Sequence, residues 1–352
     1  MKAMSLFSGA GIGESRLGEM GIDVVAANEL IESRAEIYRQ LVPFSKMICG
    51  NILDENVLNQ LIENSPSDLD LLIATPPCQG VSIAGKNRNA AQQVADDRNY
   101  LLLPIVDFIK NLRPKYVLIE NVPQYLDLAL PYKGNLKGVT QILTDEFSSD
   151  YEIDGQVINC ADLGVPQSRR RSFIKLFRKG THWPWPEFSS RHIPLSEVIF
   201  DLPSLEAGER SDLKWHFARK HSDEHVLWMS HTPSGCSAFD NPVFFPQKKN
   251  GEPIKAFSTT YKRLRWEKPS SAITMRNDAI SSQMNVHPGR KKRDGTYSDA
   301  RVLTPLELLM VNSMDTAQWN LVQASESVVR KVLGEGVPPL AVNQILSPLV
   351  GR

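Results

Sequence analysis

The chain has 352 residues, of which 41% are hydrophobic and 23% are charged. This composition is that of an ordinary globular protein, and it excludes a disordered chain. No apolar run approaches the roughly 18 residues that a membrane-spanning helix needs, and the first residues lack the apolar stretch of a secretory signal. Lysine plus arginine equals aspartate plus glutamate, 40 against 40, which argues weakly against a nucleic-acid partner.

The cysteine pattern bears on metal binding and on the redox compartment. The four cysteines, Cys49, Cys78, Cys160 and Cys236, are widely spaced and form no Cys-x-x-Cys pair. Such spacing provides neither a zinc site nor a disulfide framework. We therefore expect a reduced, cytoplasmic enzyme without a bound metal.

The first half of the chain alternates short apolar strands with helical stretches, which is typical of a doubly wound α/β fold. Candidate functional residues repeatedly follow the carboxyl ends of these strands, where open α/β sheets bind their ligands. The sequence predicts strands at 4–7, 24–27, 69–74, 116–119 and 172–177, and helices at 13–20, 33–41 and 340–349.

The pattern changes after residue 177: between 179 and about 300, many prolines and five tryptophans replace the alternation of strands and helices. We expect one domain formed by 1–178 and completed by 328–352, and a second, loop-rich domain at 179–327. Three basic clusters lie at 169–171, 262–265 and 290–293. Any one such cluster is more often an ordinary solvated face, but three of them among aromatic residues favour a surface that follows phosphates.

A glycine cluster follows the first strand. Gly9, Gly11 and Gly13 would let the backbone approach a ligand, and the start of the expected helix would favour negative charge. Glu29 ends the next strand, where a carboxylate can hold two ribose hydroxyls. A tight structural turn explains the glycines alone equally well, whereas the glycines together with Glu29 favour a nucleoside-containing cofactor.

Cys78 follows the third strand and two prolines. A lone cysteine is more often an inert buried side chain. Here the prolines stiffen the turn and direct the thiol outward, where a thiolate can act as a nucleophile. The polar, alanine-rich stretch 80–99 that follows could close over a substrate.

Two further sites of charge follow apolar segments. Glu120 ends the strand at 116–119, where partial desolvation would let it hold or donate a proton; a carboxylate that caps the following turn is an equal alternative. If the strand at 172–177 begins early, Arg169 and Arg171 alternate onto one face. There they could bind a carbonyl-bearing base, or they could be ordinary surface charges.

Six ordered blocks resemble the cytosine-5 DNA methyltransferases of bacterial restriction–modification systems and phages. Proline-cysteine-glutamine after a strand, with glutamate-asparagine-valine downstream, is their most specific part. The resemblance implies a Rossmann-like catalytic domain that depends on S-adenosylmethionine, and a smaller target-recognition domain with a bracing segment within 179–327. The blocks are residues 7–13, 77–79, 120–122, 167–171, 301–307 and 334–338.

The resemblance also implies roles for individual residues. Cys78 would attack carbon 6 of a cytosine flipped out of the duplex. Glu120 would contact ring nitrogen 3, and Arg171, supported by Arg169, would approach the base oxygen. The implied cofactor contacts are Phe7, Gly9, Gly11, Gly13, Glu29, Asn51, Ile52, Pro77 and Glu335. The implied DNA contacts are Gln79, Ser82, Lys86, Asn121, Val122 and Gln167.

Two of these positions depart from the family pattern. Asn51 stands where the family usually has aspartate, and we expect adenine binding to survive in weakened form. Glu335 stands where the family usually has asparagine, so it is carried as a candidate contact.

Three alternatives can be weighed on the sequence. A transfer-RNA cytosine methyltransferase would carry cysteine-phenylalanine-threonine in its second domain, but Cys236 is followed by Ser237 and Ala238. A non-catalytic DNA-binding protein would have lost Cys78 or Glu120, and a small-molecule methyltransferase would not need the large second domain. We therefore expect a stand-alone, monomeric enzyme that modifies specific sequences in double-stranded DNA, with a cognate restriction endonuclease as a possible partner.

Overall fold

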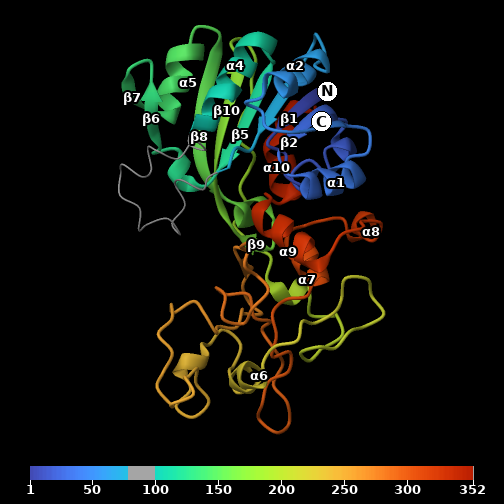
Figure 1. Cartoon of the computed structure of the whole chain (residues 1–352), viewed down its shortest axis with the longest axis vertical. Helices are drawn as coiled ribbons and strands as arrows, with labels where there is room; N and C mark the ends of the chain where they lie inside the picture. Colours follow the sequence, from blue (N-terminus) through green and yellow to red (C-terminus); the bar gives the residue numbers. More distant parts are fainter. Residues whose placement is uncertain (78–99, 352) are drawn as a thin grey trace. The chain divides into compact units, whose positions relative to one another are not determined.

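The computed structural model describes residues 1–77 and 100–351 (Figure 1). The chain divides into two compact units. Unit 1 consists of Met1–Asn159, Arg170–Glu187 and Val342–Arg352, and unit 2 consists of Cys160–Arg169 and Phe188–Ala341.

Unit 1 is built on a seven-stranded sheet. Its strands are β1 (Lys2–Leu6), β2 (Asp23–Glu29), β3 (Lys46–Cys49), β4 (Leu71–Ala74), β5 (Tyr116–Asn121), β8 (Tyr151–Asn159) and β10 (Arg170–Arg178). Their order is β3-β2-β1-β4-β5-β10-β8. The first five run parallel, and β10 runs antiparallel to both of its neighbours. The α/β prediction is confirmed, and the order reverses between β1 and β4, where open sheets of this kind bind ligands.

An apolar core holds unit 1 together. Strands β4 and β5 are buried along their whole length, as expected of central strands that are covered on both faces. Met4, Leu72 and Ile119 of the sheet belong to one buried cluster with Ile105 and Ile142 of the helices. The helices are α1 (Glu32–Leu41), α2 (Glu55–Glu63), α4 (Leu102–Leu112) and α5 (Val139–Phe147), and a hairpin adds β6 (Ala129–Tyr132) and β7 (Asn135–Gly138).

The prediction of a helix at 13–20 is wrong. Across residues 9–20, which the structure describes in full, successive turns lead to one short 3-10 helix, η1 (Gly18–Met20). Gly9 and Gly11 have φ values of 57° and 74°, in the left-handed region that a right-handed helix excludes. Glu14 turns inward and accepts a hydrogen bond from the Ser5 hydroxyl. The expectation that a helix start favours negative charge at this loop therefore does not apply.

The other predicted elements are present, with shifted ends. The helix expected at 340–349 is α10 (Pro339–Leu346) followed by a 3-10 turn, η8 (Ser347–Leu349). The division between the units falls inside α10. Sequence reasoning did not find β3, β8 or the helices α2, α4 and α5.

Unit 2 has little regular structure. Its helices are α6 (Asp223–Ser230), α7 (Pro305–Val311), α8 (Thr316–Trp319) and α9 (Glu326–Glu335), and β9 (Gln167–Ser168) pairs with β11 (Ser270–Ser271). A small apolar cluster surrounds Trp228 and Tyr261. Four arginines are also almost fully buried: Arg169, Arg263, Arg301 and Arg330. The prediction of a phosphate-following surface at 262–265 is therefore wrong for Arg263, whereas Lys291, Lys292 and Arg293 are exposed.

The observed division differs from the expected domain boundaries in three places. Residues 160–169 and 328–341 belong to unit 2, and 179–187 belong to unit 1. The last difference has a clear cause. Trp183 is 2% exposed, its ring meets that of Tyr116 edge-on at 5.6 Å, and its indole nitrogen donates to the Ile345 carbonyl at 2.9 Å.

Candidate active site

The polar residues of unit 1 gather at one edge of its sheet. The parallel strands β1, β2, β4 and β5 end there, and β10 begins there because it is antiparallel to β5. The register pairs Ser172 with Asn121 and Phe173 with Glu120, so the start of β10 brings Arg171 to the end of β5.

Glu120 and Arg171 form an ion pair at this edge. The Arg171 Nε lies 3.0 Å from the Glu120 Oε1, and the two side chains are 16% and 12% exposed, respectively. A half-buried arginine beside a carboxylate presents both a hydrogen-bond donor and an acceptor to a planar heterocycle. The structure thus brings together two of the predicted catalytic residues.

Asn121 anchors the approach to Cys78. Its side-chain nitrogen donates to the Pro76 carbonyl at 2.8 Å, and its side-chain oxygen accepts from the Val122 amide at 2.8 Å. Thr75 adds a bond from its hydroxyl to the Phe7 carbonyl at 2.8 Å. These bonds tie the end of β4 to the end of β5 and to the glycine loop. Asn121 is 3% exposed, so its side chain positions the backbone and does not face DNA as predicted.

The segment that contains the predicted nucleophile follows Pro76 and Pro77 directly. Pro77 is the last described residue before it. The predicted nucleophile Cys78 and the predicted DNA contacts Gln79, Ser82 and Lys86 lie outside the described residues.

Glu29 is held rigidly where a cofactor is predicted. Its two carboxylate oxygens accept backbone N–H groups from Gly9 and from Ile31, both at 2.9 Å. The Arg34 guanidinium lies 3.5 Å from the same carboxylate. Each carboxylate oxygen keeps further acceptor capacity, which ribose hydroxyls can use.

The surrounding loops also fit a nucleoside cofactor. A Cβ on Gly11 would lie 2.8 Å from the Tyr38 ring, so this turn excludes any larger residue. Asn51 is exposed and its side-chain oxygen accepts from the Leu53 amide at 3.1 Å, while Ile52 beside it is buried. A fixed carboxylate, an exposed amide and close-packed glycine backbone form a donor and acceptor set that suits ribose and adenine.

Gln167 and Arg169 take parts other than those predicted. Gln167 is fully buried; its amide donates to the Asn312 side chain at 2.9 Å and accepts from the Ile273 N–H at 3.1 Å. Arg169 is 2% exposed and donates to the carbonyls of Ile273, Gly334 and Glu335 at 2.7, 3.0 and 2.9 Å. Because β10 begins at Arg170, Arg169 does not alternate with Arg171 along a strand. Both buried side chains brace unit 2 in the described structure, and the predicted support of Arg171 by Arg169 and the predicted DNA contact of Gln167 remain predictions.

Glu335 is the last residue of α9, and Gly336 caps the carboxyl end of this helix. A Cβ on Gly334 would lie 2.3 Å from the Thr274 carbonyl oxygen. The glycine therefore serves close packing of α9 on a neighbouring loop. The proposed contact of Glu335 with a cofactor remains a prediction.

Sequence reasoning missed Glu14. This carboxyl is 5% exposed, and burial is the first cause that raises its pKa, to about 7. A charged residue directly after a glycine loop was the available signal, but the expected helix would have placed it on a surface.

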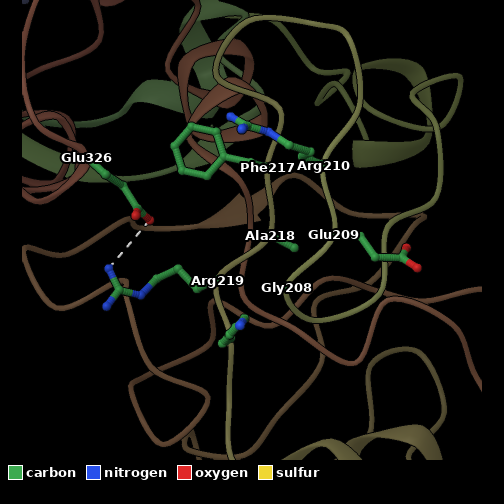
Figure 2. Close-up of a pocket in the computed structure, with 8 residues that line it drawn as sticks. Gly208, Glu209, Arg210, Phe217, Ala218, Arg219 and Glu326 are labelled. Carbon is green, nitrogen blue, oxygen red and sulfur yellow. Dashed lines mark ion pairs between the residues drawn. The ribbon is translucent and has the colours of Figure 1, made fainter.

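A hollow lies in unit 2, and its lining differs in chemistry from the residues at the strand ends of unit 1. Figure 2 shows it, lined by Gly208, Glu209, Arg210, Phe217, Ala218, Arg219, Lys220 and Glu326. Arg219 is 3.5 Å from Glu326, and no residue predicted for cofactor binding or catalysis lines it. We therefore place the chemistry at the strand ends of unit 1.

Two further properties concern residues 1–77 and 100–351. Within these ranges no group of three or more His, Cys, Asp or Glu residues is arranged to hold a metal ion. No helix in the same ranges is long and apolar enough to cross a membrane.

Comparisons with known proteins show which family the sequence resembles. The family model of the C-5 cytosine-specific DNA methylases matches residues 1–350. The Type II methyltransferase M1.HgaI of Avibacterium volantium is 46% identical over 344 residues, which cover 97% of this chain and 96% of the relative. The Type II methyltransferase M.DdeI of Desulfomicrobium norvegicum is 32% identical over 314 residues, or 78% of this chain and 71% of the relative.

Solved structures share the fold. A DNA modification methyltransferase encoded within an E. coli prophage matches with a TM-score of 0.70 at 18% identity, covering 99% of this chain and 98% of that one. The Dnmt2 methyltransferase of S. pombe matches with a TM-score of 0.61 at 14% identity, covering 99% of each chain. At such identities the likeness shows the fold alone.

The fold and the strand-end site define a methyltransferase of the α/β class. Because the family model spans nearly the whole sequence, the chain belongs to the C-5 cytosine-specific DNA methylase family. The resemblance seen in the sequence is confirmed, and the activity of the protein is methylation of cytosine in DNA at ring carbon 5.

Proposed function

We propose that the protein is an S-adenosylmethionine-dependent enzyme that methylates a flipped-out cytosine within a specific DNA sequence, with Cys78 as nucleophile. One observation carries the proposal. The Glu120–Arg171 ion pair lies at the same sheet edge as Glu29 and as the Pro76 carbonyl, two residues before Cys78. A base-binding pair, a cofactor carboxylate and the approach to a thiol thus occupy one ligand-binding edge.

The similarity to Type II methyltransferases supports a place in a restriction–modification system. The relative at 46% identity aligns over 97% of the chain. A cognate endonuclease that cleaves the unmodified sequence is the partner such a system needs.

The base side of the reaction follows from elementary chemistry. Carbon 5 of cytosine is a poor nucleophile until a thiolate adds to carbon 6. The Cys78 sulfur forms the new bond to carbon 6, and the electron pair of the ring double bond becomes available at carbon 5. Glu120 in its protonated form donates a hydrogen bond to nitrogen 3, where negative charge develops, and Arg171 binds the base oxygen. Both contacts stabilise the adduct more than the free base.

The remaining residues position the donor and complete the turnover. When bound, S-adenosylmethionine supplies the methyl group that carbon 5 accepts. Glu29 would hold the ribose hydroxyls, Gly9 and Gly11 would let the backbone approach the donor, and Asn51 would contact the adenine. The carbon 5 proton then leaves, its bonding pair re-forms the ring double bond, and Cys78 departs with the electron pair of its bond to carbon 6.

Covalent trapping tests the proposal. Fluorine at carbon 5 cannot leave as a cation, so the enzyme should remain bonded to duplex DNA that contains 5-fluorocytosine in its site. The adduct should require S-adenosylmethionine and should survive denaturing electrophoresis. Cys78→Ala should abolish the adduct and methylation while leaving DNA affinity within about tenfold. Cys236→Ala, at a partly exposed cysteine, is the matched control and should still be trapped.

The same gel separates the alternatives. Trapping of fluorinated transfer RNA in place of DNA would contradict the substrate and leave the mechanism standing. Methylation of ordinary DNA without any adduct would overturn Cys78 as the nucleophile.

A further inference from the structure

Glu14 is a buried carboxyl that the proposed mechanism does not use. It accepts a hydrogen bond from the Ser5 hydroxyl. The Ser8 hydroxyl in turn donates to the Ser5 hydroxyl at 2.9 Å and contacts the Ser5 carbonyl at 3.1 Å. Ser5 belongs to β1, and Ser8 lies between Phe7 and Gly9, so this chain of hydroxyls connects Glu14 to the loop assigned to the cofactor.

Two other carboxylates act on Glu14. Glu29 and Glu120 each raise the pKa of Glu14 by charge repulsion, in addition to the larger effect of burial, and the Ser5 hydrogen bond opposes them. None of the residues that the structure describes forms an ion pair with Glu14. Glu29 and Glu120 have their own cationic partners, Arg34 at 3.5 Å and Arg171 at 3.0 Å.

The remaining titratable neighbour of Glu14 stays neutral. Tyr38 of α1 is fully buried, and burial together with the Glu14 charge raises the pKa of its phenol. The phenol therefore keeps its proton near neutral pH. Glu14 itself exchanges a proton near pH 7, since burial and the two carboxylates raise its pKa to about that value.

We infer that Glu14 is a positioning residue that couples one proton to the charge of the methyl donor. Its carboxyl ionises when a cationic sulfonium occupies the site, and it is protonated again when the neutral thioether product occupies it. The inference rests on the proposed binding of S-adenosylmethionine at residues 7–13 and Glu29.

The physical basis is electrostatic linkage. A positive charge among three carboxyl groups offsets their mutual repulsion and favours the ionised form of the buried one. By reciprocity, ionised Glu14 binds the sulfonium more tightly than the thioether. Methyl transfer removes the positive charge, so Glu14 recovers a proton as the product becomes ready to leave. A purely structural Glu14 would have the same degree of protonation with either ligand.

Calorimetry with the ligand-free protein tests the inference. S-Adenosylmethionine and S-adenosylhomocysteine are titrated at pH 7 in two buffers of different ionisation enthalpy, which gives the number of protons released. Wild-type protein should release more protons with the donor than with the product. In Glu14→Gln both ligands should bind, and that difference should shrink to the part due to the ligands' own amino groups. The affinity ratio of donor to product should rise by about fivefold from pH 6 to pH 8 in wild type and stay flat in the variant.

A second measurement does not depend on the variant folding. Carbon-13 NMR of glutamate-labelled wild-type protein should show one carboxyl with a midpoint near pH 7. S-Adenosylmethionine should move that midpoint down, and S-adenosylhomocysteine should move it less. Ser5→Ala removes a hydrogen bond that favours the ionised form, so it should move the midpoint up in the ligand-free protein.

The outcomes separate the two proposals. Equal proton release and equal midpoint shifts with both ligands would overturn the coupling and leave cofactor binding intact. Failure of both ligands to bind wild-type protein would instead overturn the proposed cofactor.

Discussion

Both units bury backbone N–H and C=O groups, and the two units pair these groups in different ways. In unit 1 the strands and helices pair their own N–H and C=O groups, and the core between them is apolar. In unit 2 most of the backbone lies in loops, whose buried carbonyls need partners from elsewhere. Buried arginines provide these partners. In unit 2, hydrogen bonds from long donor side chains thus take the place of the ladder hydrogen bonds of a sheet.

Arg263 illustrates the second solution. Its guanidinium is fully buried and donates to the carbonyls of Met229, His287, Ser298 and Asp299 at distances of 2.7 to 3.2 Å. Burial lowers the pKa of this arginine to about 10, so it remains charged at neutral pH. One side chain thus joins the end of α6 to two loop segments of unit 2.

The largest expected effect concerns Arg301. It donates to both Glu307 oxygens at 2.8 and 3.0 Å and to Asp299 at 2.7 Å, and all three residues are at most 1% exposed. Arg301→Ala leaves two buried carboxylates without their cation, which should cost about 3–5 kcal/mol. Amide hydrogen exchange should show unit 2 opening and unit 1 retaining its protection. The apolar control Ile119→Val in unit 1 should cost about 1 kcal/mol; equal losses would break the comparison.

The second effect is a loss of stability of unit 2 at acidic pH. His287 is buried, and its Nδ1 accepts the Gly289 amide at 3.1 Å; desolvation, then Arg301, lowers its pKa to about 4. The unfolded chain binds a proton at this site near pH 6.5, whereas the folded chain does so near pH 4. Stability should therefore fall by about 3 kcal/mol as the pH drops through this window.

Urea unfolding followed between pH 4 and 7.5 measures this dependence. His287→Gln should remove the part of the slope that His287 contributes. His221, whose pKa burial also lowers to about 4, should maintain a comparable part. Glu14 in unit 1 should act with the opposite sign. Its raised pKa of about 7 means that its contribution is lost as the pH rises from about 4.5 through 7. A slope unchanged in His287→Gln would assign the acid sensitivity elsewhere.

The smallest of the three effects separates chemistry from stability. Glu120→Gln should lower the single-turnover methylation rate roughly 100-fold, about 2.7 kcal/mol, because the amide cannot give a proton to nitrogen 3. The variant keeps a similar shape and a hydrogen-bond acceptor for Arg171, so hydrogen exchange in unit 2 should not change. An unchanged rate would support the turn-capping interpretation of Glu120.

The sequence predicted those parts of the site that depend on short-range patterns. Glu29 and Glu120 each end an apolar strand, and such a carboxylate lies at the ligand-binding edge whatever the rest of the chain does. Arg169 and Gln167 looked similar, but their partners Ile273 and Asn312 are more than 100 residues away. Nothing local in the sequence shows which loop carbonyls will need an arginine. The predicted site residues Cys78, Gln79, Ser82 and Lys86 lie outside the described residues, and their roles stay predictions.

The interrupted course of unit 1 has a consequence for folding during synthesis. Trp183 and Ile345 both belong to unit 1, but to two separate segments of the chain. The Ile345 carbonyl accepts the indole N–H of Trp183. The ribosome makes all of 188–341 between these two residues. The sheet can therefore form early from nearby segments, whereas closure over Trp183 has to wait for α10, and contacts of such long sequence separation form slowly. Newly made chains should pass through a state in which unit 1 has its strands but remains sensitive to proteases around residues 179–187.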